Sequence, residues 1–273
     1  MRLAFISDIH IDLLTSEEEL ISAFIETRRN QHIDVLVIAG DISENVDITI
    51  DFINRLNEVL SCKVYYVPGN HDLWNKHNQL NTLDIYKRFQ AHDLCLVNQV
   101  IVLNEEWCLF GDVFWYDYSL ADKKHPEDLL RLKHYDDRTW QDFYFVNWDK
   151  NDDDQCQDMI DLMQEKVNGY KDKKKILVSH MINHLNFTVP ESMGEKWSFF
   201  NGFLGSQSLQ KFVLDNQFNL AVCGHVHFRN AFRDRETLFI CPCLGYEKEW
   251  PLFQKSGISL REQLEDALYC FDI

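Results

Sequence analysis

Short apolar runs with the length of β-strands alternate with amphipathic stretches over the first ninety or so residues, and this alternation restricts the fold more than any other feature of the sequence. Parallel strands joined by helices produce such a pattern, because each helix returns the chain to the same end of the sheet and covers one of its faces. The pattern therefore predicts βαβ units with a largely buried sheet. We expect the strands at residues 3–7, 35–40 and 63–67.

Two helices are expected between these strands. Ser16-Glu17-Glu18-Glu19 is typical of a capping box, and the helix that it begins would turn four apolar residues inward: Leu20, Ile21, Phe24 and Ile25. The helix expected over residues 47–60 would bury one face, formed by Ile48, Phe52, Ile53, Leu56 and Leu60. Later in the chain, a helix is predicted near residues 206–214 and strands at residues 107–112, 175–179, 220–223, 231–233, 238–241 and 267–271.

The character of the chain changes between residues 113 and 170, where aromatic and acidic side chains are concentrated, as in Trp115-Tyr116-Asp117-Tyr118 and Asp152-Asp153-Asp154. We interpret residues 113–170 as a cap or insertion within a single domain of residues 1–273, because neither a repeat nor a domain-scale linker is visible. Residues 186–205, which directly follow a predicted strand, are a candidate lid.

The amino-acid composition argues against some classes of binding partner. The 44 acidic and 27 basic residues give a formal net charge of −17, which would repel a polyanion, so binding to nucleic acid is disfavoured. No stretch approaches the roughly 18 apolar residues of a membrane span, and the first residues lack a signal-peptide core, so we expect a cytoplasmic protein with no membrane partner. The eight cysteines contain no CxxC pair, which favours free buried thiols.

Side chains of the metal-binding type gather at five points where predicted strands end and loops begin. Taken one at a time, each group has an ordinary explanation as a helix cap or a turn. Together they predict one shared site, because open α/β sheets place their ligands at the carboxyl ends of strands. The five groups are Asp8-Ile9-His10, Gly40-Asp41 with Asn45 four residues on, Gly69-Asn70-His71-Asp72, Ser179-His180, and Gly224-His225-Val226-His227.

The order of these motifs resembles the calcineurin-like metallophosphoesterase superfamily. The resemblance spans residues 8–227, and it implies a four-layer α/β/β/α sandwich of the metallophosphoesterase type, with residues 113–170 as an aromatic and acidic insertion. It also implies two metal ions bridged by Asp41. Asp8, His10, Asp41 and His227 would hold one ion, and Asp41, Asn70, His180 and His225 the other.

Mixed imidazole and carboxylate ligands suit Mn²⁺, Fe, Zn²⁺ or Ni²⁺, of which we expect Mn²⁺ to serve in vitro. A pair of such ions lowers the pKa of a shared water toward ~7 and so supplies hydroxide for attack at phosphorus. By resemblance, His71 contacts the phosphate and acts as general acid or transition-state stabiliser. Asp72 is expected to orient a histidine, most simply His71, with a turn-capping carboxylate as the alternative; Asn45 is expected to steady the metal loop.

The predicted activity is hydrolysis of a small-molecule phosphodiester or phosphomonoester by a metal-bridging hydroxide. There are two alternatives. The acidic net charge argues against a nuclease of the same superfamily, and the complete ligand set argues against a non-catalytic metal-binding scaffold. Substrate contacts are expected from Asn70 and His71 and, beyond the metal motifs, from His184, Tyr116 and Arg131, for which packing is the competing interpretation.

Overall fold

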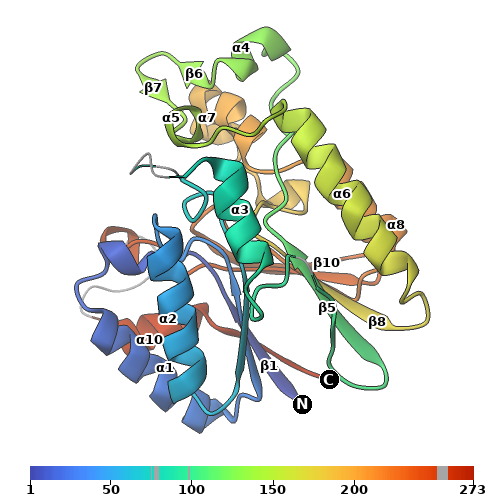
Figure 1. Cartoon of the computed structure of the whole chain (residues 1–273). Coiled ribbons are helices and arrows are strands. Elements are labelled where there is room, and N and C mark those ends of the chain that lie inside the picture. The colour runs from blue at the N-terminus through green and yellow to red at the C-terminus, as the bar shows by residue number, and fades with distance from the viewer. Residues whose placement is uncertain (75, 77–79, 98, 251–257) are drawn as a thin grey trace.

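The computed structural model describes residues 1–74, 76, 80–97, 99–250 and 258–273. Within these residues, two larger β-sheets lie face to face (Figure 1). The first has the order β12-β1-β2-β3, in which β1 (Arg2–Ile6), β2 (Val35–Ala39) and β3 (Lys63–Val67) are parallel and β12 (Tyr269–Asp272) is antiparallel to β1. The second has the order β10-β11-β9-β8-β5-β4.

In the second sheet the inner strands are parallel and both edge strands are antiparallel to their neighbours. Its strands are β4 (Ile101–Val102), β5 (Trp107–Asp112), β8 (Lys174–Ser179), β9 (Leu220–Val222), β10 (Arg229–Asp234) and β11 (Thr237–Pro242). A short hairpin of β6 (His134–Tyr135) and β7 (Arg138–Thr139) lies outside both sheets.

Alternation along the strands divides the core into layers. In β1, Leu3 and Phe5 belong to the core between the sheets, whereas Ala4 and Ile6 belong to the core under the helices. Successive side chains of a strand point to opposite faces, so a strand that is apolar throughout can serve both layers. This explains why the strand runs of the sequence carry no polar alternation.

Helices cover the outer face of each sheet, which confirms the predicted four-layer sandwich (Figure 1). The first sheet is covered by α1 (Glu17–Gln31), α2 (Val46–Val59) and α10 (Leu260–Ala267), with α3 (Thr82–Gln90) beside α2, and the second by α6 (Asp152–Asn168) and α8 (Gln207–Asp215). The remaining short helices are η1 (Ile11–Leu13), α4 (Glu127–Arg131), α5 (Asp142–Phe145), η2 (Leu185–Phe187), η3 (Glu191–Met193), α7 (Glu195–Phe200), η4 (Asn201–Phe203) and η5 (Glu247–Glu249).

The first two predicted helices begin close to where the sequence placed them. The Ser16 hydroxyl accepts a hydrogen bond from the backbone N–H of Glu19, and the side chain of Asn45 caps α2. One predicted core residue is wrong: Ile48 is 44% exposed. The buried face of α2 is centred near Thr49, Ile53 and Leu56, so position 48 falls at its edge.

The segment of residues 113–170 has two parts. Its first residues, 113–116, are fully buried, and its last helix, α6, belongs to the layer that covers the second sheet. The part with α4, β6, β7 and α5 stands above the sheets together with α7 (Figure 1). The raised cap is therefore shorter than residues 113–170.

No helix of the described residues is long and apolar enough to cross a membrane. All eight cysteines are free, and six of them are buried.

Candidate metal centre and substrate pocket

The seven predicted metal ligands follow the carboxyl ends of strands from both sheets. Asp8 and His10 follow β1, Asp41 follows β2 and Asn70 follows β3; His180 follows β8, and His225 and His227 follow β9. The sheets are tied together at this end, because Ser7 bridges to Cys243 and the backbone N–H of Gly245 donates to the Asp8 carbonyl at 3.0 Å. Parallel strands that end at one edge bring side chains distant in the sequence to a single place.

The first group of potential ligands consists of Asp8, His10, Asp41 and His227, whose ligand atoms lie within 4.8 Å of one another. The Nε2 atoms of His10 and His227 are 3.1 Å apart, and the His10 Nε2 lies 3.7 Å from Asp41 Oδ2. The His227 Nε2 lies 3.4 Å from Asp8 Oδ1. Nitrogen and carboxylate oxygen atoms that face one another in this way form a donor set suited to a divalent transition metal.

The second group consists of Asp41, His180 and His225, and Asn70 lies beside it. The His180 Nε2 is 3.3 Å from Asp41 Oδ1, 3.0 Å from Asn70 Oδ1 and 3.2 Å from His225 Nδ1. Asp41 belongs to both groups, with Oδ1 toward His180 and Oδ2 toward His10. A carboxylate placed between two ligand groups has the geometry of a bridge between two cations.

Three of the histidines have their second ring nitrogen next to a fixed oxygen acceptor. The Nδ1 of His180 lies 2.9 Å from the Ala39 carbonyl, and the Nε2 of His225 lies 3.2 Å from the Phe203 carbonyl. The Nδ1 of His227 lies 2.8 Å from Glu249 Oε2. A proton held at these outer nitrogens leaves the inner nitrogen with a lone pair directed into the site, which is how metal-binding histidines are usually oriented.

The buried carboxylates of the site favour the binding of a cation. Burial opposes ionisation of Asp41, but His180 and the other histidines outweigh it and hold its pKa well below the usual value. Burial lowers the pKa of His225 to about 4, so its ring is neutral at pH 7. Burial also opposes protonation of His180, but the carboxylate of Asp41 raises its pKa to about 9. The carboxylates thus attract a proton to the position where a metal ion would sit.

The backbone at the ligands is unusual. Asp8, His10, Asp41, His225 and His227 all have positive φ, between 41° and 74°, a left-handed conformation that few residues other than glycine adopt. Hydrogen bonds from Asp8 N–H to the Gly40 carbonyl and from His10 N–H to the Asp41 carbonyl hold these turns together. Strained conformations of this kind persist where the surrounding structure fixes them, and they cluster at functional sites.

Two glycines allow the metal loops to approach closely. A Cβ atom at Gly69 would lie 2.1 Å from Asp41 Oδ1, and one at Gly224 would lie 2.6 Å from Asp8 Oδ2. Any larger residue at these positions would displace a carboxylate of the site. The glycines of both motifs are therefore explained by space beside the ligands.

Comparison with known proteins agrees with this geometry. The model of the family described as calcineurin-like phosphoesterase matches residues 1–229. The chain belongs to this family.

Named relatives of this phosphoesterase are distant. A probable cyclic nucleotide phosphodiesterase of Coxiella burnetii is 25% identical over 257 residues, which cover 88% of this chain and 81% of that protein. An uncharacterized protein of Acanthamoeba polyphaga mimivirus is 25% identical over 143 residues, 48% of this chain, and the match spans only 50% of the viral protein. Among solved structures, the phosphopantetheinyl hydrolase PptH of Mycobacterium tuberculosis has a TM-score of 0.77 at 17% identity, covering 98% of this chain and 95% of that one, which shows a common fold.

His71 lies at the edge of the two groups of candidate ligands. Its Nε2 is 3.8 Å from Asp41 Oδ2, its Nδ1 is 3.5 Å from Glu44 Oε1, and its ring stacks on Trp74 with centroids 3.7 Å apart. The neighbouring His71 and Lys76 hold the pKa of Glu44 at about 2, so Glu44 is ionised at neutral pH. The carboxylate that faces the outer nitrogen of His71 is therefore Glu44, which the sequence did not single out.

Asp72 does not contact His71, contrary to the expectation that it orients this histidine. Its buried carboxylate accepts hydrogen bonds from the backbone N–H groups of Ile42, Ser43 and Gly69 and from the hydroxyl of Thr49. The residue thus ties the loop after β2 to the loop after β3. Its position in Gly-Asn-His-Asp directs it backward into the loop, because the chain turns between His71 and Trp74.

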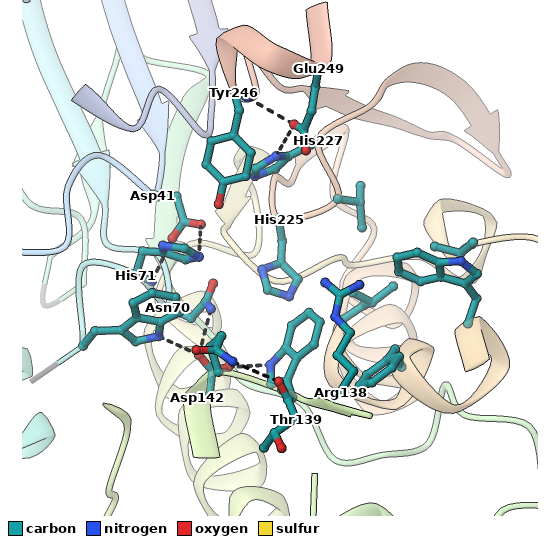
Figure 2. Close-up of a pocket in the computed structure, with 18 of the residues that line it drawn as sticks. Asp41, Asn70, His71, Arg138, Thr139, Asp142, His225, His227, Tyr246 and Glu249 are labelled. Atoms are coloured by element: carbon teal, nitrogen blue, oxygen red, sulfur yellow. Dashed lines mark hydrogen bonds and ion pairs between the residues drawn. The ribbon is translucent and has the colours of Figure 1, made fainter. Parts of the chain in front are cut away.

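Asp142, in α5, is a buried acceptor that no sequence motif marks. Its Oδ1 accepts from Asn70 Nδ2 at 2.9 Å (Figure 2) and from Trp74 Nε1 at 2.7 Å. Its Oδ2 accepts from Trp140 Nε1 at 2.8 Å and from Tyr116 Oη at 3.3 Å. The bond to Nδ2 fixes which way the Asn70 amide points, so that its oxygen faces His180. Asp142 therefore connects the raised cap to the candidate metal centre.

A cavity of about 480 Å³ opens onto the ligands (Figure 2). Asp41, Asn70, His71, His225 and His227 form part of its wall. The opposite wall comes from the cap and from the lid candidate at residues 186–205: Arg138, Thr139, Trp140, Gln141, Val189, Trp197, Phe200 and Leu204. The volume is that of a small-molecule site.

Three of the predicted substrate contacts do not line this cavity. Tyr116 is fully buried and bonded to Asp142 and Lys133, and Arg131 forms ion pairs with Glu127 and Asp153. His184 is also buried, and its Nε2 lies 3.3 Å from Asp234 Oδ2. Packing within the fold accounts for all three, which was the competing interpretation.

Proposed function

We propose that this chain is a phosphoesterase that uses two divalent transition-metal ions to hydrolyse a small-molecule phosphodiester or phosphomonoester. The observation that carries the proposal is the sharing of Asp41 between two ligand groups at the floor of a cavity of about 480 Å³. The donor set fits such ions, because the outer nitrogens of His180, His225 and His227 have acceptors that leave the inner nitrogens free.

Asp8, His10, Asp41 and His227 would hold one ion, and Asp41, Asn70, His180 and His225 the other. Bound there, the ions would supply hydroxide at neutral pH and neutralise charge that develops on the phosphate oxygens. The chain itself would orient the ester, exclude water with its aromatic walls and deliver a proton. For the last role we propose His71, whose Nδ1 faces the ionised Glu44 and whose Nε2 faces the cavity side of Asp41.

The test is hydrolysis of bis(4-nitrophenyl) phosphate. Chelated protein should be inert and Mn²⁺ should restore cleavage, whereas Asp41→Asn should abolish it at every metal concentration because both ligand groups lose their shared charge. Asp158→Asn, on the exposed side of α6, is the matched control and should behave like the wild type. Absence of turnover of both this diester and 4-nitrophenyl phosphate with Mn²⁺, Fe²⁺, Zn²⁺ and Ni²⁺ would indicate the scaffold alternative, and salt-sensitive degradation of DNA would indicate a nuclease.

The substrate panel should contain cyclic nucleotides beside linear diesters and monoesters, because the Coxiella relative is named a probable cyclic nucleotide phosphodiesterase. Specificity would reside in the cap and lid walls. An identity of 25% over the whole match leaves most side chains of the two proteins free to differ. A ranking of kcat/KM over the panel would decide between diester and monoester.

A further inference from the structure

The cavity wall holds a single lysine or arginine among the residues described, and it is Arg138 of β7. The other charged groups of the wall are carboxylates and the metal-centre histidines. Figure 2 shows the Arg138 side chain extending from the cap into the pocket. Arg138 is itself exposed to solvent, so it lies at the open side of the cavity, and in a chain with a net charge of −17 an arginine at this position is an exception to its surroundings.

The guanidinium group is held by aromatic rings. Its Cζ lies 5.6 Å from the ring centre of Trp197 and 5.5 Å from that of Phe200, both within the range of a cation–π contact. Such stacking leaves the N–H groups at the edge of the guanidinium plane available as donors. The rings therefore favour this position of the charge without consuming its hydrogen bonds.

Arg138 forms no ion pair with any carboxylate in the described part of the chain. Its neighbour Asp137 pairs instead with Lys196 at 3.1 Å. Arg131, the other arginine of the cap, contacts Glu127 and Asp153 and lies outside the pocket. Arg131 is thus neutralised within the fold, whereas the N–H donors of the Arg138 guanidinium group remain available to a ligand in the cavity.

We propose that Arg138 forms an anion subsite, so that the preferred substrates are phosphate esters that carry a second anionic group away from the reacting phosphorus. A planar fork of donors matches a carboxylate or a phosphate in two parallel hydrogen bonds. The reacting phosphate would occupy the metal centre, and the second anion would lie against Arg138 between the aromatic walls. The inference rests on the proposed function for its substrate class, but the subsite itself can be measured by binding alone.

The binding test compares three phosphonates that are not turned over: phenylphosphonate, 4-carboxyphenylphosphonate and 1,4-phenylenebisphosphonate. Calorimetry on the Mn²⁺-loaded protein should give about 10- to 100-fold tighter binding for at least one of the two with a second anion, the range expected for a charge-assisted pair. The carboxylate and phosphonate arms show which anion the subsite takes. Arg138→Gln should remove the preference and leave the affinity for phenylphosphonate unchanged, and Arg138→Lys should restore part of it.

Arg131→Gln distinguishes the two arginines of the cap, and it should retain the full preference. Equal affinity of the wild type for all three phosphonates, a preference that survives in Arg138→Gln, or its loss in Arg131→Gln would overturn the proposal. The kinetic counterpart is kcat/KM for 4-nitrophenyl phenyl phosphate and its 4-carboxyphenyl analogue, which share one leaving group. If neither these diesters nor the monoesters of the substrate panel are cleaved under any metal, the proposed function fails, and the calorimetric comparison still decides the subsite.

Discussion

Replacement of Asp142 by asparagine tests how strongly the cap and the candidate metal centre depend on one carboxylate. Asp142 accepts four hydrogen bonds from neutral donors, two at each oxygen. An amide of the same shape keeps one acceptor oxygen and turns an NH₂ group toward the remaining two donors. If the oxygen faces Asn70 and Trp74, the donors of Trp140 and Tyr116 lose their acceptor.

The expected loss follows from the number of donors left unpaired. A buried donor without an acceptor costs about 1–3 kcal/mol, so two of them predict a loss of about 2–6 kcal/mol in the free energy of unfolding of the metal-free protein. The second expected effect is on metal binding, because Asn70 would no longer be held by a charged acceptor. Loss of such an outer contact weakens metal affinity by about 10- to 100-fold.

Urea denaturation followed by tryptophan fluorescence measures the first effect, and calorimetric titration with Mn²⁺ measures the second. Asp158→Asn removes a carboxylate from an exposed ion pair with Lys150 and should change the free energy of unfolding by less than about 1 kcal/mol. A variant Asp142→Asn as stable as this control, with two ions bound at wild-type affinity, would show that the four contacts are not needed to position Asn70.

Three further predictions concern single residues. His71→Gln should lower kcat by about 10²- to 10⁴-fold with two ions still bound, and loss of metal by elemental analysis would refute its role as acid. Gly69→Ala should prevent metal uptake, because the added Cβ would overlap Asp41, whereas Gly169→Ala, at the end of α6, should take up metal normally. Burial raises the pKa of Asp112 to about 6. Between about pH 4 and pH 6 the folded protein therefore keeps a proton on Asp112 that the unfolded chain has lost, so the free energy of unfolding falls as pH rises through this range. Asp112→Asn should remove this fall, worth about 3 kcal/mol, from urea-unfolding curves, and identical slopes for variant and wild type would contradict it.

The layers of the fold and the meeting of the five motifs at one sheet edge could be predicted because both follow from local rules. Strand runs such as residues 63–67 are apolar over the length of a strand, and residues placed just after parallel strands meet at one sheet edge. The error at Ile48 also comes from a local rule. Spacing along the sequence gives the centre of a buried helical face, but contact with the neighbouring sheet determines which residues at its edge are buried.

The pocket walls could not be predicted in the same way. The cap has no regular period, so nothing local distinguishes Arg131, which is paired within the fold, from Arg138, which lines the cavity. Asp142 gives no signal either, because its four donors come from segments that only the tertiary structure brings together. The role of Glu44 could not be predicted either, because Glu44 and His71 belong to different loops that only the tertiary structure brings together.

The left-handed turns at Asp8, Asp41 and His225 help to set the spacing of the candidate ligand side chains. The turns at Asp8 and Asp41 are held by hydrogen bonds between the loops that follow β1 and β2 of the first sheet, and the backbone N–H of His225 donates to the Asp8 carboxylate from the second sheet. The protein alone makes all of these contacts. We therefore expect the turns to form in the metal-free chain as well. Treatment with a chelator should abolish cleavage of bis(4-nitrophenyl) phosphate and leave the far-UV circular dichroism spectrum unchanged.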